Sequence, residues 1–408
     1  VNLKGDKVIS DLNLSLSLGA KRTLVGELSM TYARSRLILG MSTVGTVVLA
    51  CLAVLGFEIY RNFEAVILES AMDQVIALAL ILAGLFGILL PFDILGGFLL
   101  PTRFSKSKTT FQKWFVSYLW GVTGQFFSYI ILGVLVINLA GFQPLIATLG
   151  FAVLSVFVLL IRNTLISCRL KPSRKADASL GKAEELARSW LPISNQIYVV
   201  NREDIGYTGG IIGFGRRSKI LIPRRWLSFG VDVLATIIAR REIAISSFSH
   251  TIGLILALAC NTSGFICVNL LCSSPVGSLA WLIEFISWFN LWTFFSLLIL
   301  PTFSRAASSW VDHRLVSLKV PKALVIHAAE TMNVLQDNER SRSMLIETIF
   351  HPIPSVERRS RERPLVPIKT WQVARTSLFV SWAGLSLLAR AVHCNVGRPD
   401  LWLLLPSD

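Results

Sequence analysis

Long apolar runs separated by short polar loops dominate the 408 residues of this chain. A helix needs roughly 20 residues to cross a bilayer, and six runs approach or exceed that length. They are Leu37–Phe57, Val75–Leu100, Trp114–Ile137, Leu145–Ile161, Thr251–Leu271 and Leu279–Leu300. A seventh run, Thr376–Leu388, is too short to cross, so we expect it to lie in the membrane interface or to pack on the bundle.

The composition agrees with a membrane protein, since 53% of the residues are hydrophobic and only 16% are charged. Soluble domains average about 25% charged residues. The net charge of +15 is best explained by basic cytoplasmic loops that contact anionic headgroups. No nucleic-acid recognition motif accompanies this charge, so no nucleic-acid partner is expected. The six cysteines form no C-x-x-C pair, which argues against a zinc knuckle.

Lysine and arginine gather in alternate loops, which predicts that both long polar regions face the cytoplasm. We expect a mainly α polytopic protein with a small α+β cytoplasmic domain split by a transmembrane hairpin. The expected parts are a cytoplasmic segment (1–36), a four-helix transmembrane region (37–162), the first domain half (163–250), the hairpin (251–300), the second half (301–375), and an interfacial hydrophobic segment with a tail (376–408). Because no transit peptide is evident, a bacterial inner membrane is the expected location.

Within the first half, residues 181–191 have the spacing of an amphipathic helix. The segments "QIYVV" and "KILIP" are typical of strands, and a β-turn or hairpin is expected between them. The glycines of that connection do not form a phosphate-binding motif. A helix over 231–249 is expected to lead directly into the fifth span.

Three short motifs carry the candidate chemistry: "ARREIAISSFSH" before the hairpin, and "SRAASSWVD" and "HPIPSVERR" after it. Their order resembles that of membrane zinc metallopeptidases of the HtpX and CAAX prenyl protease type, and the resemblance covers roughly residues 180–360. In those proteins an H-E-x-x-H helix runs toward a transmembrane hairpin. A helix with S-R-x-x-E-x-x-x-D follows, and H-P-x(n)-R closes the domain.

The resemblance implies a role for each matching position. Glu242 matches the general base, while Arg241, Ile245 and Ser308 stand where the three zinc ligands are expected. The register one residue earlier would place Arg240 and Ala244 at the first two ligand positions. The matching positions that would support the site are Arg240, His250, Asp312, His351 and Arg358, the last one residue later than usual.

The sequence thus has the order of the family's motifs but lacks a histidine or glutamate at each of the three zinc-ligand positions. A catalytic zinc needs about three protein ligands, and an arginine side chain stays protonated and cannot coordinate a metal. We therefore expect no cofactor, with Arg240 or Arg241 pairing with Glu242 or Asp312 in place of the ion. The alternative is a zinc site rebuilt from other residues, for which His250, His351, Glu242 and Asp312 are the candidates.

The predicted function is that of a pseudopeptidase in the lipid bilayer, which binds a membrane protein partner or forms a homo-oligomer. The exposed edge of "KILIP" or "QIYVV" could pair with an extended segment of that partner without any metal. An active zinc metalloendopeptidase with atypical ligands is the alternative. A transporter that uses Asp93, an acid within an apolar run, is a third hypothesis, although a broken helix end explains that residue more simply.

Overall fold

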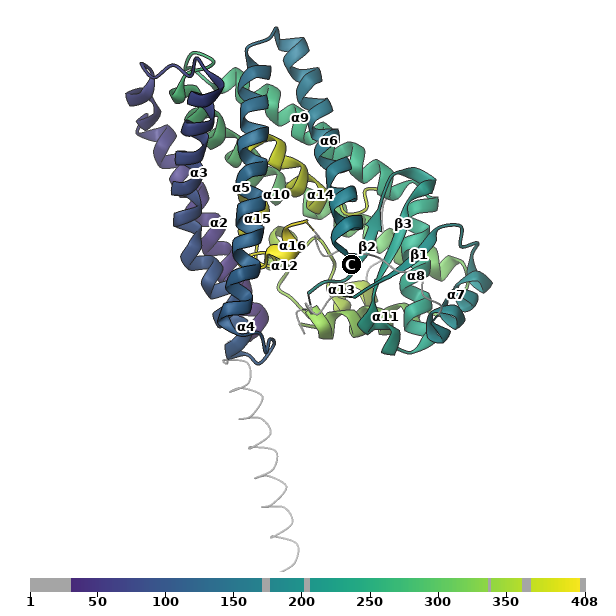
Figure 1. The fold of residues 1–408 in the computed structure, drawn as a ribbon. Helices are drawn as coiled ribbons and strands as arrows, with labels where there is room; N and C mark the ends of the chain where they lie inside the picture. Colours follow the sequence, from purple (N-terminus) through teal and green to yellow (C-terminus); the bar gives the residue numbers. More distant parts are fainter. Residues whose placement is uncertain (1–30, 171–176, 202–205, 337–338, 362–367, 404–408) are drawn as a thin grey trace, which may run out of the picture.

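The computed structural model describes most of the chain outside its N-terminal segment (Figure 1). The described residues are 31–170, 177–201, 206–336, 339–361 and 368–403. The predicted cytoplasmic segment 1–36 lies outside them up to residue 30.

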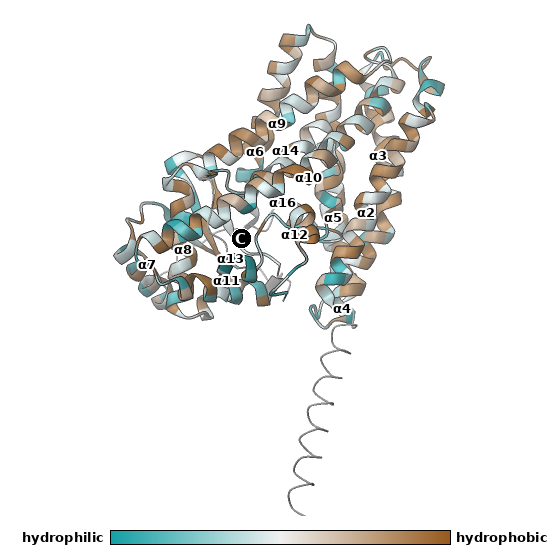
Figure 2. Cartoon of the chain, turned by 180° about the vertical axis from the view of Figure 1, so that it is seen from behind, coloured by the Kyte–Doolittle hydropathy of each residue, from teal (hydrophilic) through white to brown (hydrophobic). Residues whose placement is uncertain are grey.

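Six helices are long and apolar enough to cross a membrane, which confirms the predicted fold class. They are α2 (Tyr32–Gly56), α3 (Ala71–Ile94) with its continuation to Arg103, α5 (Phe111–Ala140), α6 (Pro144–Leu170), α9 (Ser249–Leu271) and α10 (Leu279–Ser317). Each overlaps one predicted span. These helices are largely hydrophobic (Figure 2), and many of their large apolar side chains are exposed, among them Leu49, Leu80 and Ile131, as expected for contact with lipid.

The second span does not break at "LLPFDILGG". Helix α3 passes through Pro91 and continues as a π-helical turn, η2 (Leu95–Leu99), and then as α4 (Leu100–Arg103). The carbonyl oxygen of Gly96 in this turn accepts a hydrogen bond from the Arg36 side chain of α2. A neighbouring helix thus supplies a donor to the altered backbone, as is common where proline interrupts a membrane helix.

The small domain packs beside one end of the helical bundle. The sequence predicts that this end faces the cytoplasm. Its sheet has the order β1-β3-β2, with β1 (Gln196–Val200) parallel to β3 (Lys219–Pro223) and β2 (Gly210–Ile212) antiparallel to β3. The expected hairpin between "QIYVV" and "KILIP" is therefore wrong, since these strands run parallel. Both are almost continuously apolar, which is typical of buried parallel strands.

The helices of the two domain halves are α7 (Ala178–Trp190), α8 (Val231–Ser246), α11 (Lys322–Gln336), α12 (Met344–Phe350) and α13 (Val356–Arg361). Residues of α7, α8 and α11 share one apolar core with the sheet. Shorter helical turns are η3 (Gly215–Arg217) and η4 (Arg224–Ser228) in this domain, and η1 (Ile59–Phe63) between α2 and α3. Helix α8 stops before the fifth span, because Phe248 takes a left-handed conformation with φ of 60°.

Helix α10 connects membrane and domain without interruption. It has 39 residues and spans about 58 Å at 1.5 Å per residue. The predicted boundary between hairpin and second half, at residue 300, falls inside this helix next to Pro301. The long helix carries the motif "SRAASSWVD" from the membrane into the domain.

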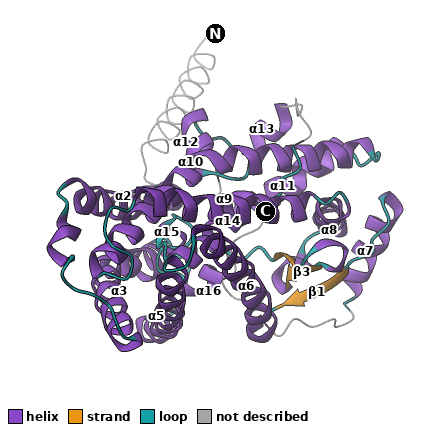
Figure 3. Ribbon diagram, turned by 90° about the horizontal axis from the view of Figure 1, so that it is seen from above, coloured by secondary structure: helices purple, strands orange, loops and turns teal. Residues whose placement is uncertain are grey.

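The segment 368–403 lies inside the bundle. It contains α14 (Val373–Val380), η5 (Ser381–Gly384), α15 (Leu388–Ala391) and α16 (Pro399–Leu403). Viewed from above, α14 and α15 are surrounded by the spanning helices (Figure 3). Nearly every residue of these two helices is buried. Of the two positions expected for Thr376–Leu388, the structure has the packing on the bundle and not the interfacial one, since this stretch buries its apolar surface against protein. The interfacial assignment of residues 376–408 is therefore wrong for the described part.

A buried ion pair fixes this segment to the bundle. Arg390 of α15 donates two hydrogen bonds to the Asp93 carboxylate, through Nη2 and, at 3.0 Å, through Nε. The Tyr118 hydroxyl and the Gly397 amide also donate to Asp93, at 3.1 and 2.7 Å. Asp93 thus lies within a continuous helix and has a specific partner, rather than at the broken helix end expected from the sequence.

Glycines on the spanning helices allow this close approach. A Cβ atom on Gly40 of α2 would collide with the backbone of His393, and one on Gly97 would collide with the Gly397 carbonyl. Any side chain at these positions would displace the segment 368–403 from its position inside the bundle. The packing is therefore specific to glycine at both places.

Candidate functional site

Helix α8 places three consecutive charged residues in a buried environment. Arg240, Arg241 and Glu242 are all almost fully inaccessible to solvent. Successive residues of an α-helix point about 100° apart, so these side chains diverge toward three different partners. Those partners decide what each residue can do.

Arg240 contacts α10, the helix that carries the second motif. Its Nε donates to Asp312 Oδ1 at 2.7 Å, and its Nη2 donates to Ser308 Oγ at 3.1 Å. The guanidinium also lies over the Trp371 ring, 5.5 Å from the ring centroid. Because Ser308 and Asp312 are one helical turn apart, they share the face of α10 that meets α8.

A second arginine reaches the same place. Arg359 of α13 lies 3.4 Å from Asp312 Oδ2 through Nη1 and donates to Ser308 Oγ at 3.4 Å through Nη2. Sequence reasoning had singled out Arg358 instead, which lies 3.8 Å from Glu347. The two neighbours point in different directions from the short helix α13, so a shift of one residue decides which of them enters the site. We call Arg240, Ser308, Asp312 and Arg359 the arginine cluster.

Arg241 joins α8 to the sheet. Its Nη1 donates to the Leu221 carbonyl of β3 at 2.6 Å, and its Nη2 donates to the Thr208 carbonyl at 2.7 Å. The guanidinium lies 5.4 Å from the centroid of the Trp226 ring. Arg241 therefore donates to one backbone carbonyl of β3 and to one in the segment that precedes β2.

Glu242 points away from the arginine cluster. Its carboxylate accepts hydrogen bonds from the Ser194 amide and hydroxyl, both at 3.2 Å, and from Asn195 Nδ2 at 3.0 Å. These residues precede β1, so Glu242 holds the entry of that strand. Ile245, one turn from Arg241, is buried among apolar neighbours.

The histidines also lie apart. His250 Nε2 is 3.3 Å from the Gly213 carbonyl, beside β2. His351 follows α12, and its ring packs against His393 at a centroid distance of 5.1 Å. Burial lowers the pKa of His351 well below its usual range, and the cations Arg342, His393, Arg375 and Arg305 lower it further. Arg305 itself donates to three carbonyls at the end of α12, those of Glu347, Thr348 and His351.

The donor set of the arginine cluster does not fit the zinc ion that the resemblance implies. The cluster offers one carboxylate and one hydroxyl beside two guanidinium groups, which repel a cation and have no lone pair to give. Across the described part of the chain, no three His, Cys, Asp or Glu side chains gather closely enough to hold a metal ion. His250, His351, Glu242 and Asp312, considered above for a rebuilt site, belong to four separate hydrogen-bonded surroundings.

Comparisons with known proteins bear on the fold. No family model and no curated protein matches this sequence. Among solved structures, the crystal structure of S. mikatae Ste24p superposes with a TM-score of 0.60 and 14% sequence identity. The match covers 76% of this chain and 81% of that one, and so includes both membrane and domain parts. The chain therefore shares the fold of Ste24p, a polytopic helical membrane protein with a small α+β domain.

Proposed function

We propose that this protein is a membrane pseudopeptidase that acts by binding a membrane protein partner, as a subunit, adaptor or scaffold. The fold shared with Ste24p supports a relationship to membrane metallopeptidases. The motif residues Ser304, Arg305 and Asp312 on α10 and His351 and Pro352 after α12 support the same relationship.

The ion pair between Arg240 and Asp312 is the observation that carries the proposal. It lies where "SRAASSWVD" meets α8, the place at which the resemblance implies a metal. The Arg240 guanidinium contacts Ser308, the residue at the position that the resemblance assigns to the third ligand, and this contact supports a permanent positive charge in place of the ion. This contact favours the register in which Arg240 and Ala244 replace the first two ligands, one residue before the register that makes Glu242 the base.

The strand β1 is the better candidate for partner binding. "KILIP" forms β3, which is paired on both sides and offers no free edge. "QIYVV" forms β1 at the border of the sheet, with Gln196 exposed. Strand addition at such an edge needs only backbone hydrogen bonds.

Metal content tests the loss of hydrolytic chemistry. We expect the purified full-length protein to hold far less than one zinc per chain and to show no chelator-sensitive hydrolysis of casein. The triple variant Arg240→His, Ala244→His, Ser308→Glu should gain zinc, because it restores three donors on facing helices. The matched triple variant Arg241→His, Ile245→His, Ser308→Glu should not. One zinc per chain in the natural protein, with chelator-sensitive hydrolysis, would instead favour the active peptidase.

Site-specific crosslinking tests the binding role. A photoreactive residue at Gln196 in β1 should give an adduct with a membrane protein in intact cells, while one at the exposed Lys182 of α7 should not. A protein that stays monomeric after gentle extraction and gives no adduct from β1 would contradict the proposal.

A further inference from the structure

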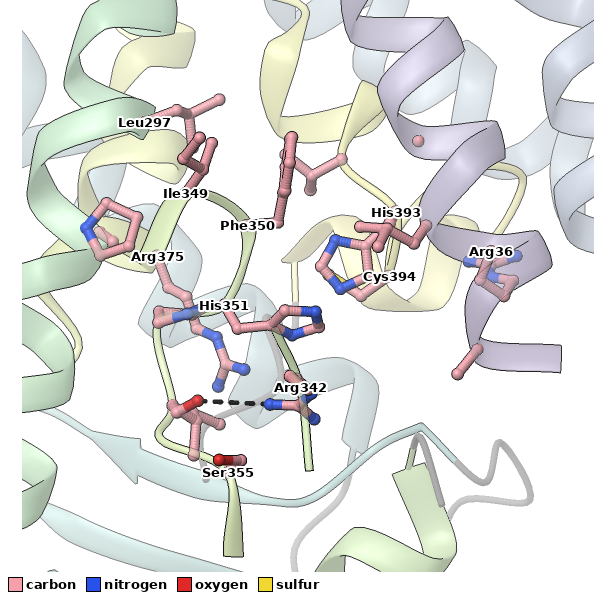
Figure 4. Close-up of a pocket in the computed structure, with 18 of the residues that line it drawn as sticks. Arg36, Leu297, Arg342, Ile349, Phe350, His351, Ser355, Arg375, His393 and Cys394 are labelled. Carbon is pink, nitrogen blue, oxygen red and sulfur yellow. Dashed lines mark hydrogen bonds between the residues drawn. The ribbon is translucent and has the colours of Figure 1, made fainter. Parts of the chain in front are cut away.

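A cavity of about 170 Å³ lies where α2 and α10 meet the segment after α12 and the segment 392–398. It is separate from the arginine cluster except for Arg359, which lines it. Figure 4 shows Leu297 and Phe350 on one side of this cavity and Arg342 on the opposite side, with His351 between them. The cavity therefore has two chemically different ends.

The apolar end belongs to the two spanning helices. It is lined by Leu37, Met41 and Val44 of α2 and by Phe294, Leu297 and Leu298 of α10. Because these residues lie within membrane spans, this end is at membrane depth. An acyl chain that enters this end from the bilayer would remain among apolar groups, so it would not have to leave an apolar environment.

The other end is cationic. Its arginine and histidine residues are Arg36, Arg342, Arg359, Arg375, Arg398, His351 and His393. No aspartate or glutamate is among the described residues that line the cavity. Two of these arginines are close to carboxylates outside the cavity lining. Arg342 lies 4.0 Å from Glu339, and Arg359 lies 3.4 Å from Asp312. Arg36 donates to the carbonyls of Gly96 and Val396. Arg342, Arg375 and His351 lie together in the cavity wall.

His351 gives independent support for a ligand at this end. The residue is only 7% exposed, and its Nε2 atom has no hydrogen-bond partner. A buried polar atom without a partner is costly, and an anion that accepts a hydrogen bond would remove that cost. The low pKa of the His351 ring, caused by burial and by the surrounding cations, reflects the same positive potential.

We propose that this cavity binds a lipid with an anionic phosphate headgroup. The phosphate lies among Arg342, Arg375 and His351, where guanidinium groups can bind it through paired hydrogen bonds. One acyl chain runs past Leu297 and Met41 toward the membrane. A cavity of about 150 Å³ holds a benzene ring, so one of about 170 Å³ has room for the phosphate and the first part of a chain, and the rest of that chain would lie in the bilayer.

Binding of dioctanoyl phosphatidic acid to the full-length protein in a nonionic detergent tests the proposal. Thermal unfolding should shift upward with this lipid in a saturable way, because a ligand of the folded state stabilises it. Dioctanoyl phosphatidylcholine and inorganic phosphate should cause much smaller shifts. Arg375→Gln should weaken the affinity for phosphatidic acid about tenfold, the effect of one lost charge-assisted hydrogen bond.

Two further variants separate binding from folding. Arg188→Gln, at an exposed arginine on α7, should bind phosphatidic acid like the natural protein. Leu297→Trp should fill the apolar end and weaken binding at least tenfold, while the melting temperature without lipid shows whether the variant folds. Equal shifts with phosphatidylcholine would overturn the role of the headgroup charge. Equal binding of inorganic phosphate, or unchanged affinity in both Arg375→Gln and Leu297→Trp, would overturn the lipid site.

Discussion

Asp93 of α3 and Arg390 of α15 form a buried ion pair across 297 positions of the chain. The Arg390 guanidinium also lies 4.6 Å from the ring centroids of both Phe86 and Trp402. This pair joins the second span to the segment that fills the bundle. It also accounts for the acid in the apolar run without a transported ion or proton.

Removing one partner of this pair should destabilise the protein strongly. We expect Asp93→Asn to lower the free energy of unfolding by about 3–5 kcal/mol, because it leaves the Arg390 charge buried without its counter-ion. Thermal unfolding in detergent measures the loss, with Glu58→Gln at an exposed loop acid as the control. The double variant Asp93→Leu, Arg390→Met should be more stable than Asp93→Asn. A melting temperature for Asp93→Asn equal to that of the control would contradict this account.

A methyl group on one face of α2 should displace the segment inside the bundle. We expect Gly40→Ala to lower the melting temperature by several degrees, because its Cβ would overlap the backbone of His393. Gly45 lies on the same helix with nothing within 4 Å of its ideal Cβ position. Gly45→Ala should therefore be neutral or slightly stabilising, since alanine favours the helix. Equal effects of the two substitutions would argue against the packing described here.

The ion pair of the arginine cluster should be structural. Arg240→Ala should lower stability by about 3 kcal/mol or more, since it leaves Asp312 with only the longer contact to Arg359. The exposed arginine Arg217 provides the matched control. Chemical denaturation of the two variants compares their stabilities, and the zinc content of Arg240→Ala should not rise. A stable Arg240→Ala that binds zinc would mean that the arginine only blocks a usable metal site.

Glu242 should matter for stability and not for hydrolysis. Its carboxylate accepts several hydrogen bonds from Ser194 and Asn195, so Glu242→Ala should cost about 2–3 kcal/mol. Hydrogen exchange should show faster opening at the start of β1 in this variant. A loss of proteolytic activity in a folded Glu242→Gln protein would instead assign the residue to catalysis.

Acid should weaken the fold through His351. In the folded protein the pKa of this ring lies well below its usual range, chiefly because of burial and then because of the nearby cations. The unfolded chain takes up a proton as the pH falls below about 6.5, while the folded protein does not, so stability is lost as the pH decreases through that value. The slope approaches about 1.4 kcal/mol per pH unit for one group.

Melting temperatures measured between pH 8 and pH 5 test this slope. His351→Gln should reduce the loss at low pH, whereas the same change at the exposed His327 should not. An unchanged pH profile in His351→Gln would assign the acid sensitivity to other groups.

The membrane architecture was readable from sequence because each span is a local property of about 20 consecutive residues. The path of residues 368–403 was not, because its position depends on contacts with distant helices. The thirteen residues of Thr376–Leu388, most of them apolar, fit an interfacial helix as well as a buried one. The contacts that separate the two, such as the pairing of Arg390 with Asp93 and the approach of His393 to Gly40, are not encoded in any local pattern.

The candidate site shows a similar limit at finer scale. The motifs lie on helices that meet in the structure, and one of the expected pairings, Arg240 with Asp312, is present. The motifs did not fix which of two neighbouring residues points into the site. A shift of one position along a helix turns the side chain by about 100°. That rotation separates Glu242 from the arginine cluster and exchanges Arg358 for Arg359.

The burial of residues 368–403 bears on how the protein is made. These residues follow all six spanning helices in the chain, so each span is synthesised before its interior neighbours. Until residue 390 has been made, Asp93 has no Arg390 to pair with, and Gly40 and Gly97 lack the backbone that later packs on them. The bundle therefore reaches its final packing only when the last part of the chain is in place.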